Sequence, residues 1–116
     1  MTNHRVSRGR ASQEYLAARL RALGVPHARS RPASLPGSDV EGWLAVDVEV
    51  KATEAVSLVS WLRQSVKRAG GLLPLVVYRP RGFGEASLAD WPVSMRGGDL
   101  EPLLRAGGYL PEEPGA

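Results

Sequence analysis

The sequence predicts an α/β fold, and three observations support this class. Valines alternate with charged residues over residues 46–51, which is the period of a strand buried on one face. Residues 72–78 are almost entirely apolar, as expected of a central strand buried on both faces. Residues 13–23 and 56–69 place apolar side chains at helical spacing, before and after the alternating run. We therefore expect helices and strands to alternate along one small domain.

The first helix is expected to begin after Ser7, or after Ser12 in a shorter interpretation, and to end at Gly24, leaving residues 1–7 frayed. The spacing predicts a buried stripe on this helix made of Leu16, Leu20 and Leu23, joined at the side by Tyr15 and Ala18. Residues 25–31 could form a short strand, which Pro26 limits to an edge or a strand start. A proline-rich loop at 32–38 then leads to Asp39.

The most informative pattern lies between Asp39 and Lys51. Glu49 and Lys51 project side by side opposite the valines, about 7 Å apart at a rise of roughly 3.3 Å per residue. Asp39 precedes Glu49 across a short strand and a tight turn that contains Gly42. With an odd number of residues in the turn, Asp39 lies opposite Glu49, and two carboxylates converge on one divalent cation. With an even number, Asp39 pairs with Val48 or Val50 and its side chain points into the core.

The second half of the chain continues the alternation. The second helix is expected to stop at Gly70, with Leu58, Leu62, Val66 and Ala69 buried and with Trp61, Gln64 and Arg68 on a different face. A strand at 72–78, a basic turn at 79–84, a strand at 90–95 and a closing helix at 99–105 follow, with Asp99 as the N-cap of that helix. The domain is expected to span residues 1–106, and residues 107–116 to form a flexible tail.

Composition excludes several classes of protein. The chain is 43% hydrophobic and 23% charged, as is typical of a globular domain. No apolar stretch approaches the ~20 residues that span a membrane, and no signal-peptide core follows the N-terminus, so we expect a cytoplasmic protein. The absence of cysteine excludes disulfides and thiolate zinc sites.

Charge is segregated along the chain. Residues 5–31 hold seven arginines and one acid, residues 39–54 hold five acids and one lysine, and residues 63–81 hold five basic residues and no acid. This order suits a nuclease, in which cationic walls bind phosphates and carboxylates bind a metal. Alternatively, the arginines coat solvated helices. The predicted DNA-binding residues are Arg8, Arg10, Arg29, Arg31, Arg63, Lys67, Arg68, Arg79 and Arg81.

A family resemblance follows from these residues. Gly37-Ser38-Asp39 followed by Glu49-Val50-Lys51, behind an arginine-rich helix that carries Glu14, resembles the PD-(D/E)XK nuclease superfamily. Within it, the chain is most similar to the small Holliday junction resolvase-like endonucleases of bacteria, phages and archaea, over nearly the whole domain. One departure is that Gly37-Ser38 precedes Asp39, with Pro36 earlier than the proline of the family.

The resemblance implies a restriction-endonuclease-like fold, with a mixed central sheet of about five strands flanked by helices on both faces. It also implies a homodimer in the cytoplasm of a bacterium or of a phage-infected host. This homodimer would cleave branched DNA with Mg²⁺, which Mn²⁺ could replace, to 5′-phosphate and 3′-hydroxyl ends. By the same resemblance Asp39, Glu49 and the Val50 carbonyl would bind the metal and Lys51 would orient the attacking water. Glu14 would complete the metal site, and Gln64 would lie close to it.

Alternatives remain open for two of these residues and for the function. Glu14 could be a solvated acid that pairs with Arg10 or Arg21 at helical spacing, and Gln64 could be an exposed helical side chain. The protein could also be a nuclease of the same superfamily with a repair or restriction target. A further alternative, from another class, is a non-catalytic DNA-binding module on the same scaffold.

Overall fold

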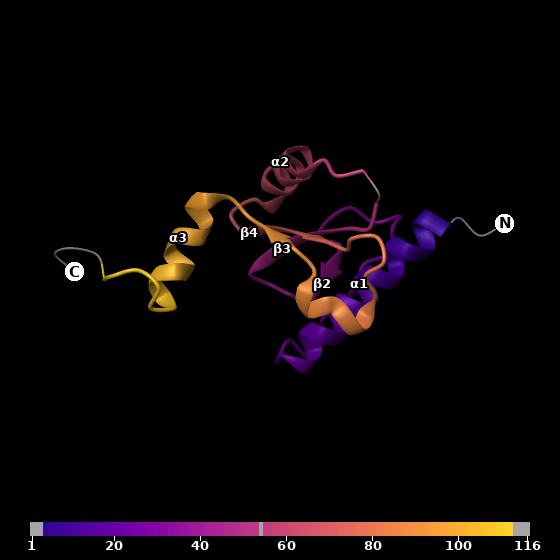
Figure 1. Ribbon diagram of the computed structural model, residues 1–116, viewed down its shortest axis with the longest axis horizontal. Helices are drawn as coiled ribbons and strands as arrows, with labels where there is room; N and C mark the ends of the chain where they lie inside the picture. Colours follow the sequence, from indigo (N-terminus) through magenta and orange to yellow (C-terminus); the bar gives the residue numbers. More distant parts are fainter. Residues whose placement is uncertain (1–3, 54, 113–116) are drawn as a thin grey trace.

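The α/β class is confirmed by the computed structural model, which describes residues 4–53 and 55–112, with side chains described from Arg8 onwards. The elements in chain order are α1 (His4–Ala22), β1 (Arg29–Ser30), β2 (Val40–Glu41), β3 (Val46–Lys51), α2 (Leu58–Ala69), β4 (Leu73–Tyr78), the 3₁₀ helix η1 (Glu85–Asp90), β5 (Val93–Ser94) and α3 (Gly97–Ala106) (Figure 1).

β4 is the central strand of a three-stranded mixed sheet, parallel to β3 and antiparallel to β5. β3 and β4 pair from Val46 beside Leu73 to Lys51 beside Tyr78. β1 and β2 form a separate antiparallel ribbon of two strands. The five strands expected in one sheet are therefore divided between a mixed sheet and a ribbon.

The division arises where the chain enters β2. Asp39 N–H donates to the Val48 carbonyl at 2.9 Å, but the Val48 N–H donates to the Ser38 hydroxyl, also at 2.9 Å. A side chain thus replaces a backbone acceptor, and the ladder between the two segments does not continue. Gly42 then turns the chain with φ +84°, where a Cβ would lie 2.1 Å from the His27 carbonyl oxygen. Glycine is required at this turn by both its conformation and this close approach.

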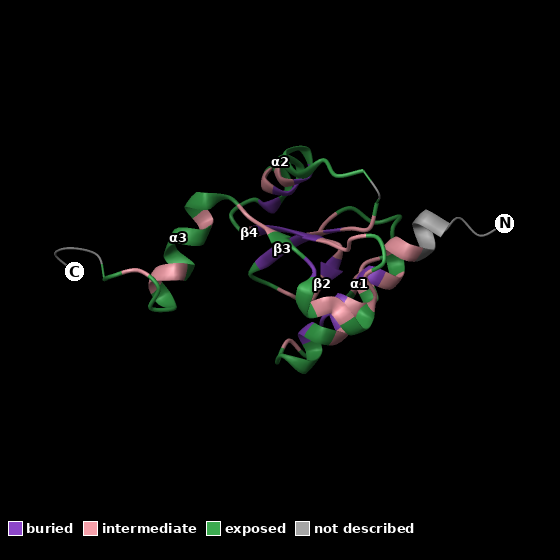
Figure 2. Ribbon diagram, viewed as in Figure 1, coloured by how far each residue is buried: buried purple, intermediate pink, exposed green. Residues whose placement is uncertain are grey.

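Helices cover both faces of the β3–β4 pair, α1 on one face and α2 on the other (Figure 1). The valines of β3 face α1, where they form the core with Leu16 and Leu20. The alternate side chains of β3 face α2, so Asp47 is buried although it is charged. The predicted alternation of β3 is therefore confirmed, and Figure 2 shows the buried segments concentrated between the two helices.

α1 differs from the expected helix at both ends. It begins at His4, within the segment expected to be frayed. Leu23 lies beyond the helix and is exposed, whereas Ala17 is buried. The buried stripe is Leu16, Ala17 and Leu20, because the helix ends before Leu23 can reach the sheet.

α2 ends where expected, at Gly70 in the left-handed conformation, but it buries a different face. Its buried residues are Trp61, Ser65 and Ala69, whereas Leu58 is exposed. Of the predicted stripe, Ala69 is buried as expected and Leu62 and Val66 are half-buried, so the prediction is wrong for Leu58. Trp61 and Ser65, predicted on other faces, are buried because α2 is rotated to bring Arg68 to Asp47 on the charged side of β3. The leucines and valines of α2 lie on its flank instead.

The C-terminal region holds further differences. η1 was not predicted, and β5 is shorter than the expected strand. Arg96 is the N-cap of α3, and the predicted N-cap Asp99 lies in the first turn, where it accepts from Arg96 Nε at 2.8 Å. The structure describes residues 107–112 of the expected tail. Within them, the Pro111 carbonyl accepts a hydrogen bond from Arg105. The remainder of the tail lies outside the described residues.

α3 is set apart from the rest of the molecule (Figure 1). Within the part of the chain that the structure describes, it packs extensively on no other element. No described helix combines the length and apolar character needed to cross a membrane.

Candidate metal centre

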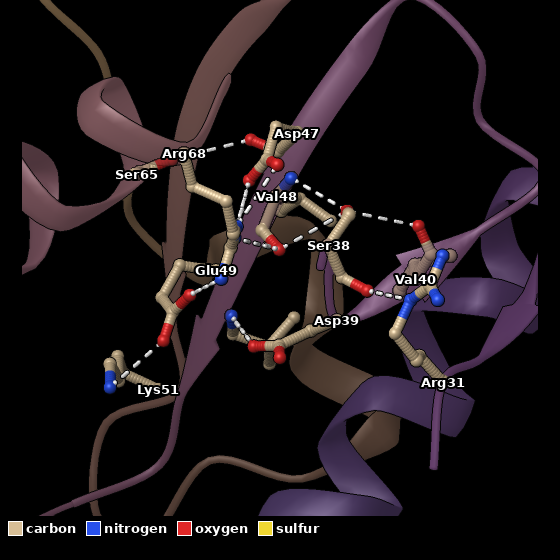
Figure 3. A network of polar contacts seen from close by, with 11 residues as sticks. Arg31, Ser38, Asp39, Val40, Asp47, Val48, Glu49, Lys51, Ser65 and Arg68 are labelled. Atoms are coloured by element: carbon tan, nitrogen blue, oxygen red, sulfur yellow. Dashed lines mark hydrogen bonds and ion pairs between the residues drawn. The ribbon is translucent and has the colours of Figure 1, made fainter. Parts of the chain in front are cut away.

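Glu49 and Lys51 project from the same face of β3, as the period of two predicts (Figure 3). Lys51 Nζ lies 3.0 Å from Glu49 Oε1, so the two side chains form an ion pair. The other carboxylate oxygen of Glu49 accepts from Arg68 Nη1 at 2.8 Å. Cations of the chain therefore hold both oxygens of Glu49.

Asp39 reaches the same stretch of β3 from the loop before β2. Its Oδ2 accepts from the Val50 N–H at 2.7 Å, and its own N–H donates to Val48. Asp39 thus lies beside Val48, the register expected to send its side chain into the core. The side chain avoids the core because β2 begins only at Val40, so Asp39 does not follow the alternation of a paired strand. Its carboxylate lies instead along the edge of β3 (Figure 3).

The Val50 carbonyl points to the same edge as the Asp39 carboxylate. Along a strand, the backbone groups of successive residues point to opposite edges. The Lys51 carbonyl accepts from Arg79 N on the β4 side, whereas the Val48 carbonyl accepts from Asp39 N. Val50 follows Val48 by two positions, so its carbonyl oxygen and the Asp39 carboxylate share one edge.

Burial and the nearby Glu49 carboxylate raise the pKa of Asp39 from 3.8 to about 6. The hydrogen bond from Val50 N–H and the charges of Arg68 and Lys51 lower this pKa, but they do not offset the first two causes. A cation bound beside Asp39 would stabilise its ionised form. The electrostatics of this edge therefore favour additional positive charge.

Arg68 is the residue of this cluster whose role the sequence did not indicate. Its guanidinium bridges Glu49 and Asp47, and Asp47 is only 4% exposed. The hydrogen bond to Asp47 is the main cause that raises the pKa of Arg68. Arg68 was predicted to bind DNA, but it binds carboxylates of β3. The alternation of β3 could have indicated this role. It places Asp47 on the same face as Glu49, and a buried carboxylate there requires a cationic partner from the helix that covers that face.

Glu14 and Gln64 do not join this cluster. Glu14 is exposed and pairs with Arg10 at 3.3 Å, which is one of the alternatives that helical spacing left open. Gln64 is exposed on α2. The helix face that meets the cluster carries Trp61 instead, whose ring centre lies 5.7 Å from Lys51 Nζ.

Two of the predicted DNA-binding arginines are partly buried and tie elements together. Arg8 donates to the Pro80 carbonyl at 2.8 Å, and Arg79 donates to Ser12 Oγ at 3.1 Å. The Arg79 guanidinium lies 5.4 Å from the centre of the Tyr15 ring, and burial lowers its pKa. These two side chains join α1 to the segment after β4, so the structure gives each of them a structural role, and their role in DNA binding stays a prediction.

The other predicted DNA-binding residues lie nearer the surface. Arg10, Arg29 and Arg31 line a groove of about 700 Å³ between α1 and β1, together with Glu14. Arg29 and Arg31 also pair with Glu41, so part of their charge is compensated. Arg63, Lys67 and Arg81 are exposed elsewhere on the molecule.

Among residues 4–53 and 55–112, no group of three or more histidine, aspartate or glutamate side chains is arranged to hold a metal ion. A divalent ion at this edge would therefore depend on the carboxylates of Asp39 and Glu49 and on the Val50 carbonyl. Comparison with protein-family models, with curated proteins and with solved structures finds no match to this chain.

Proposed function

We propose that this protein is a Mg²⁺-dependent, structure-selective DNA endonuclease that acts as a Holliday junction resolvase. One observation carries the proposal. Asp39 accepts from the Val50 N–H, is close enough to Glu49 for that carboxylate to raise its pKa, and shares an edge of β3 with the Val50 carbonyl, while Lys51 pairs with Glu49. This combination is the one that the resemblance to PD-(D/E)XK nucleases implies.

The order of elements supports a restriction-endonuclease-like fold as part of the proposal. A helix precedes the strand that carries Glu49 and Lys51, and a helix and a parallel strand follow it. α1 and α2 cover opposite faces of that strand. The main departure is the separation of β1 and β2 from the three-stranded sheet.

The residues at this edge suit Mg²⁺. In proteins Mg²⁺ is commonly bound by one or two carboxylates, with waters and substrate phosphate in its other positions. Asp39 and Glu49 supply the carboxylates, and a bound cation would counteract the burial and the Glu49 charge that raise the pKa of Asp39. When bound, the ion would polarise the phosphate and make a bound water more acidic. Mn²⁺ prefers similar oxygen ligands and could replace it.

The side chains of the protein would then orient the substrate. Lys51 offers a compact ammonium beside Glu49, suited to hold the attacking water and to offset charge that develops on the phosphate. The arginines of the groove between α1 and β1 would bind the phosphate backbone. A dimer with two such sites at fixed separation would cut opposed strands of a junction.

Cleavage of a synthetic four-way junction in Mg²⁺ tests this proposal. We expect Glu49→Ala and Lys51→Ala each to lower the rate by on the order of 100-fold or more, because each removes a group that stabilises the transition state. Glu85→Ala, at an exposed glutamate of η1, is the matched control and is expected to cleave normally. Circular dichroism checks that all variants fold. Activity that survives either site substitution refutes the assignment.

Substrate structure separates the resolvase from other nucleases. A junction, a flap and a linear duplex of the same sequence are compared in one assay. Preference for the junction supports the resolvase. Equal cleavage of the duplex would instead support a nuclease with a repair or restriction target.

A non-catalytic DNA-binding module is the second candidate, and one observation favours it. Lys51 and Arg68 already hold both oxygens of Glu49. Calorimetric titration with Mg²⁺ and Mn²⁺ separates the two candidates. The nuclease predicts a specific site that Asp39→Asn abolishes, whereas the DNA-binding module predicts no such site and DNA binding that is independent of the metal.

A further inference from the structure

The buried face of α2 matches the charged face of β3 along its length. Near the C-terminal end of α2, Arg68 pairs with Asp47 and Glu49. Two turns earlier on the same helix, the centre of the Trp61 ring lies 5.7 Å from Lys51 Nζ. α2 therefore runs antiparallel to β3, with an arginine over the two acids and an aromatic ring over the lysine.

The Trp61 ring is fixed in place by its surroundings. The residue is only 8% exposed. It packs beside Tyr78 of β4, with the two ring centres 5.7 Å apart and the ring planes tilted by 36°. Tyr78 is held in turn, because it lies beside Lys51 in the sheet and its hydroxyl donates to the Thr53 carbonyl at 3.1 Å. The ring next to the ammonium therefore has little freedom to move away.

The Lys51 ammonium lies between an anion and this ring. Its Nζ is 3.0 Å from Glu49 Oε1, and a quarter of the side chain (25%) is exposed, so solvent and substrate can reach it. The face of a tryptophan ring attracts an ammonium that lies within about 6 Å of the ring centre. The contact with Trp61 meets this condition.

The two contacts of the ammonium respond differently to a divalent ion. This step rests on the proposed function, in which Glu49 binds Mg²⁺. A bound ion would compete with Lys51 for the Glu49 carboxylate and would repel the ammonium. Mg²⁺ takes oxygen ligands, so it leaves the uncharged ring of Trp61 in contact with Lys51.

An aromatic ring suits this position better than another acid would. A carboxylate at position 61 would accept hydrogen bonds from the ammonium and would also compete for the metal. The ring attracts the charge through its face, and N–H donors of the lysine stay available for a water or a phosphate oxygen.

We propose that Trp61 is the positioning residue of Lys51. Its ring holds the ammonium at the site when Glu49 binds the metal, and Lys51 thereby keeps the orientation that the attacking water requires. Trp61 acts through Lys51 and does not touch the substrate. Loss of the ring should therefore slow the chemical step and leave substrate binding nearly unchanged.

NMR of the lysine side chains tests the contact without any cleavage. The chain has two lysines, and Lys67, exposed on α2, is the internal reference for Lys51. In protein labelled with ¹³C-lysine, the ring current of Trp61 should shift the ε-proton signal of Lys51 upfield of that of Lys67, without Mg²⁺ and with it. Coincident signals, or a shift that disappears when Mg²⁺ is added, would overturn the proposal. This comparison uses the natural protein, so it does not depend on the folding of a variant.

Substitution of the ring tests its role in cleavage. Trp61→Met fills the same space without a ring, and it should move the Lys51 signal downfield towards that of Lys67. It should also lower kcat for a four-way junction by about 10-fold with little change in KM. Trp61→Phe keeps a ring and should recover most of the rate. Trp43→Met, at a tryptophan just before β3 and therefore at the opposite end of the strand from Lys51, is the matched control and should cleave normally.

A double substitution separates positioning from a merely structural role. In a Lys51→Ala background, Trp61→Met should cause no further loss of kcat, because the ring acts through the lysine. A further loss of about 10-fold there, or cleavage by Trp61→Met at the natural rate, would overturn the proposal. Circular dichroism checks that the variants fold. A natural protein that cleaves no DNA would refute the proposed nuclease, and the NMR comparison would still decide whether Trp61 holds Lys51.

Discussion

The Asp39 carboxyl binds its proton more tightly in the folded protein than in the unfolded chain, because burial and Glu49 raise its pKa to about 6. Its contribution to stability is therefore fully present below about pH 4 and is lost as the pH rises through about 6. At neutral pH the ionised carboxylate should lower the free energy of unfolding by on the order of 2–3 kcal/mol, unless a cation binds beside it.

Asp39→Asn should remove this dependence, because the asparagine oxygen can accept from Val50 N–H without ionising. Between about pH 4 and about pH 7.5, the natural protein should lose about 2 kcal/mol of unfolding free energy relative to the variant. Urea unfolding at both pH values measures the difference. At the higher pH, Mg²⁺ should stabilise the natural protein and not the variant. Asp90→Asn, at an exposed aspartate, is the control and should follow the natural protein at both pH values. If Asp39→Asn also followed the natural protein at both pH values, the prediction would be contradicted.

Arg68 stabilises the fold through the buried carboxylate of Asp47. Arg68→Met would leave that carboxylate without its cation, at an expected loss of about 2 kcal/mol or more. Partial exposure of Arg68 keeps the loss below that of a fully buried pair. Urea unfolding should show little change for Lys67→Met, at the neighbouring exposed position. The double variant with Asp47→Asn should recover part of the loss, and strictly additive losses would count against the ion pair.

Among the elements, the β1–β2 ribbon depends on one glycine. Gly42 and Gly82 have the same φ of +84°, but a Cβ at Gly42 would meet the His27 carbonyl, whereas a Cβ at Gly82 would meet nothing within 4 Å. Gly82→Ala should therefore show only the conformational loss, about 1 kcal/mol. Gly42→Ala should lose at least about 2 kcal/mol more, because the ribbon must shift. Thermal unfolding of the pair measures the difference, and equal losses would show that the close approach has no energetic weight.

Local periodicity predicted the elements better than the faces they bury. The alternation of β3 and the apolar run of β4 were sufficient to place both strands, because each pattern reflects burial within a few residues. The buried face of α2 could not be predicted in this way. It depends on Asp47, a residue distant in sequence, whose burial requires a polar helix face opposite it.

The candidate site was predicted to the extent that it is local. Glu49 and Lys51 lie two residues apart on one strand, so their shared face follows from the period alone. Asp39 was named correctly as a neighbour of this strand, but its approach from the edge depends on the Ser38 hydroxyl, which no short-range pattern indicates. Glu14 belongs to another groove because the position of α1 over the sheet is a tertiary property.

At the scale of the whole molecule, the basic residues divide into structural and exposed sets, and salt dependence distinguishes them. The logarithm of the DNA-binding constant falls with the logarithm of the salt concentration, and each phosphate contact that is lost should make this slope less steep by about 0.9. Arg10→Gln combined with Arg29→Gln should therefore lower the slope for duplex DNA by about 2, because both side chains line the groove between α1 and β1. Fluorescence anisotropy across a salt series measures the slope.

Arg79→Gln is the contrasting variant. It should lower stability, because Arg79 bonds to Ser12 in the interior, and should leave the slope unchanged. A slope that fell for Arg79→Gln and not for the groove pair would place the DNA elsewhere.

The way in which Asp39 meets β3 has a consequence for solubility. β3 is an outer strand of the three-stranded sheet, and the free backbone groups of outer strands can pair with other chains to begin aggregation. The side chains of Ser38 and Asp39 occupy the amides of Val48 and Val50, so a foreign strand finds these donors already engaged. The carboxylate proposed to bind the metal would thus also protect the protein from forming fibres.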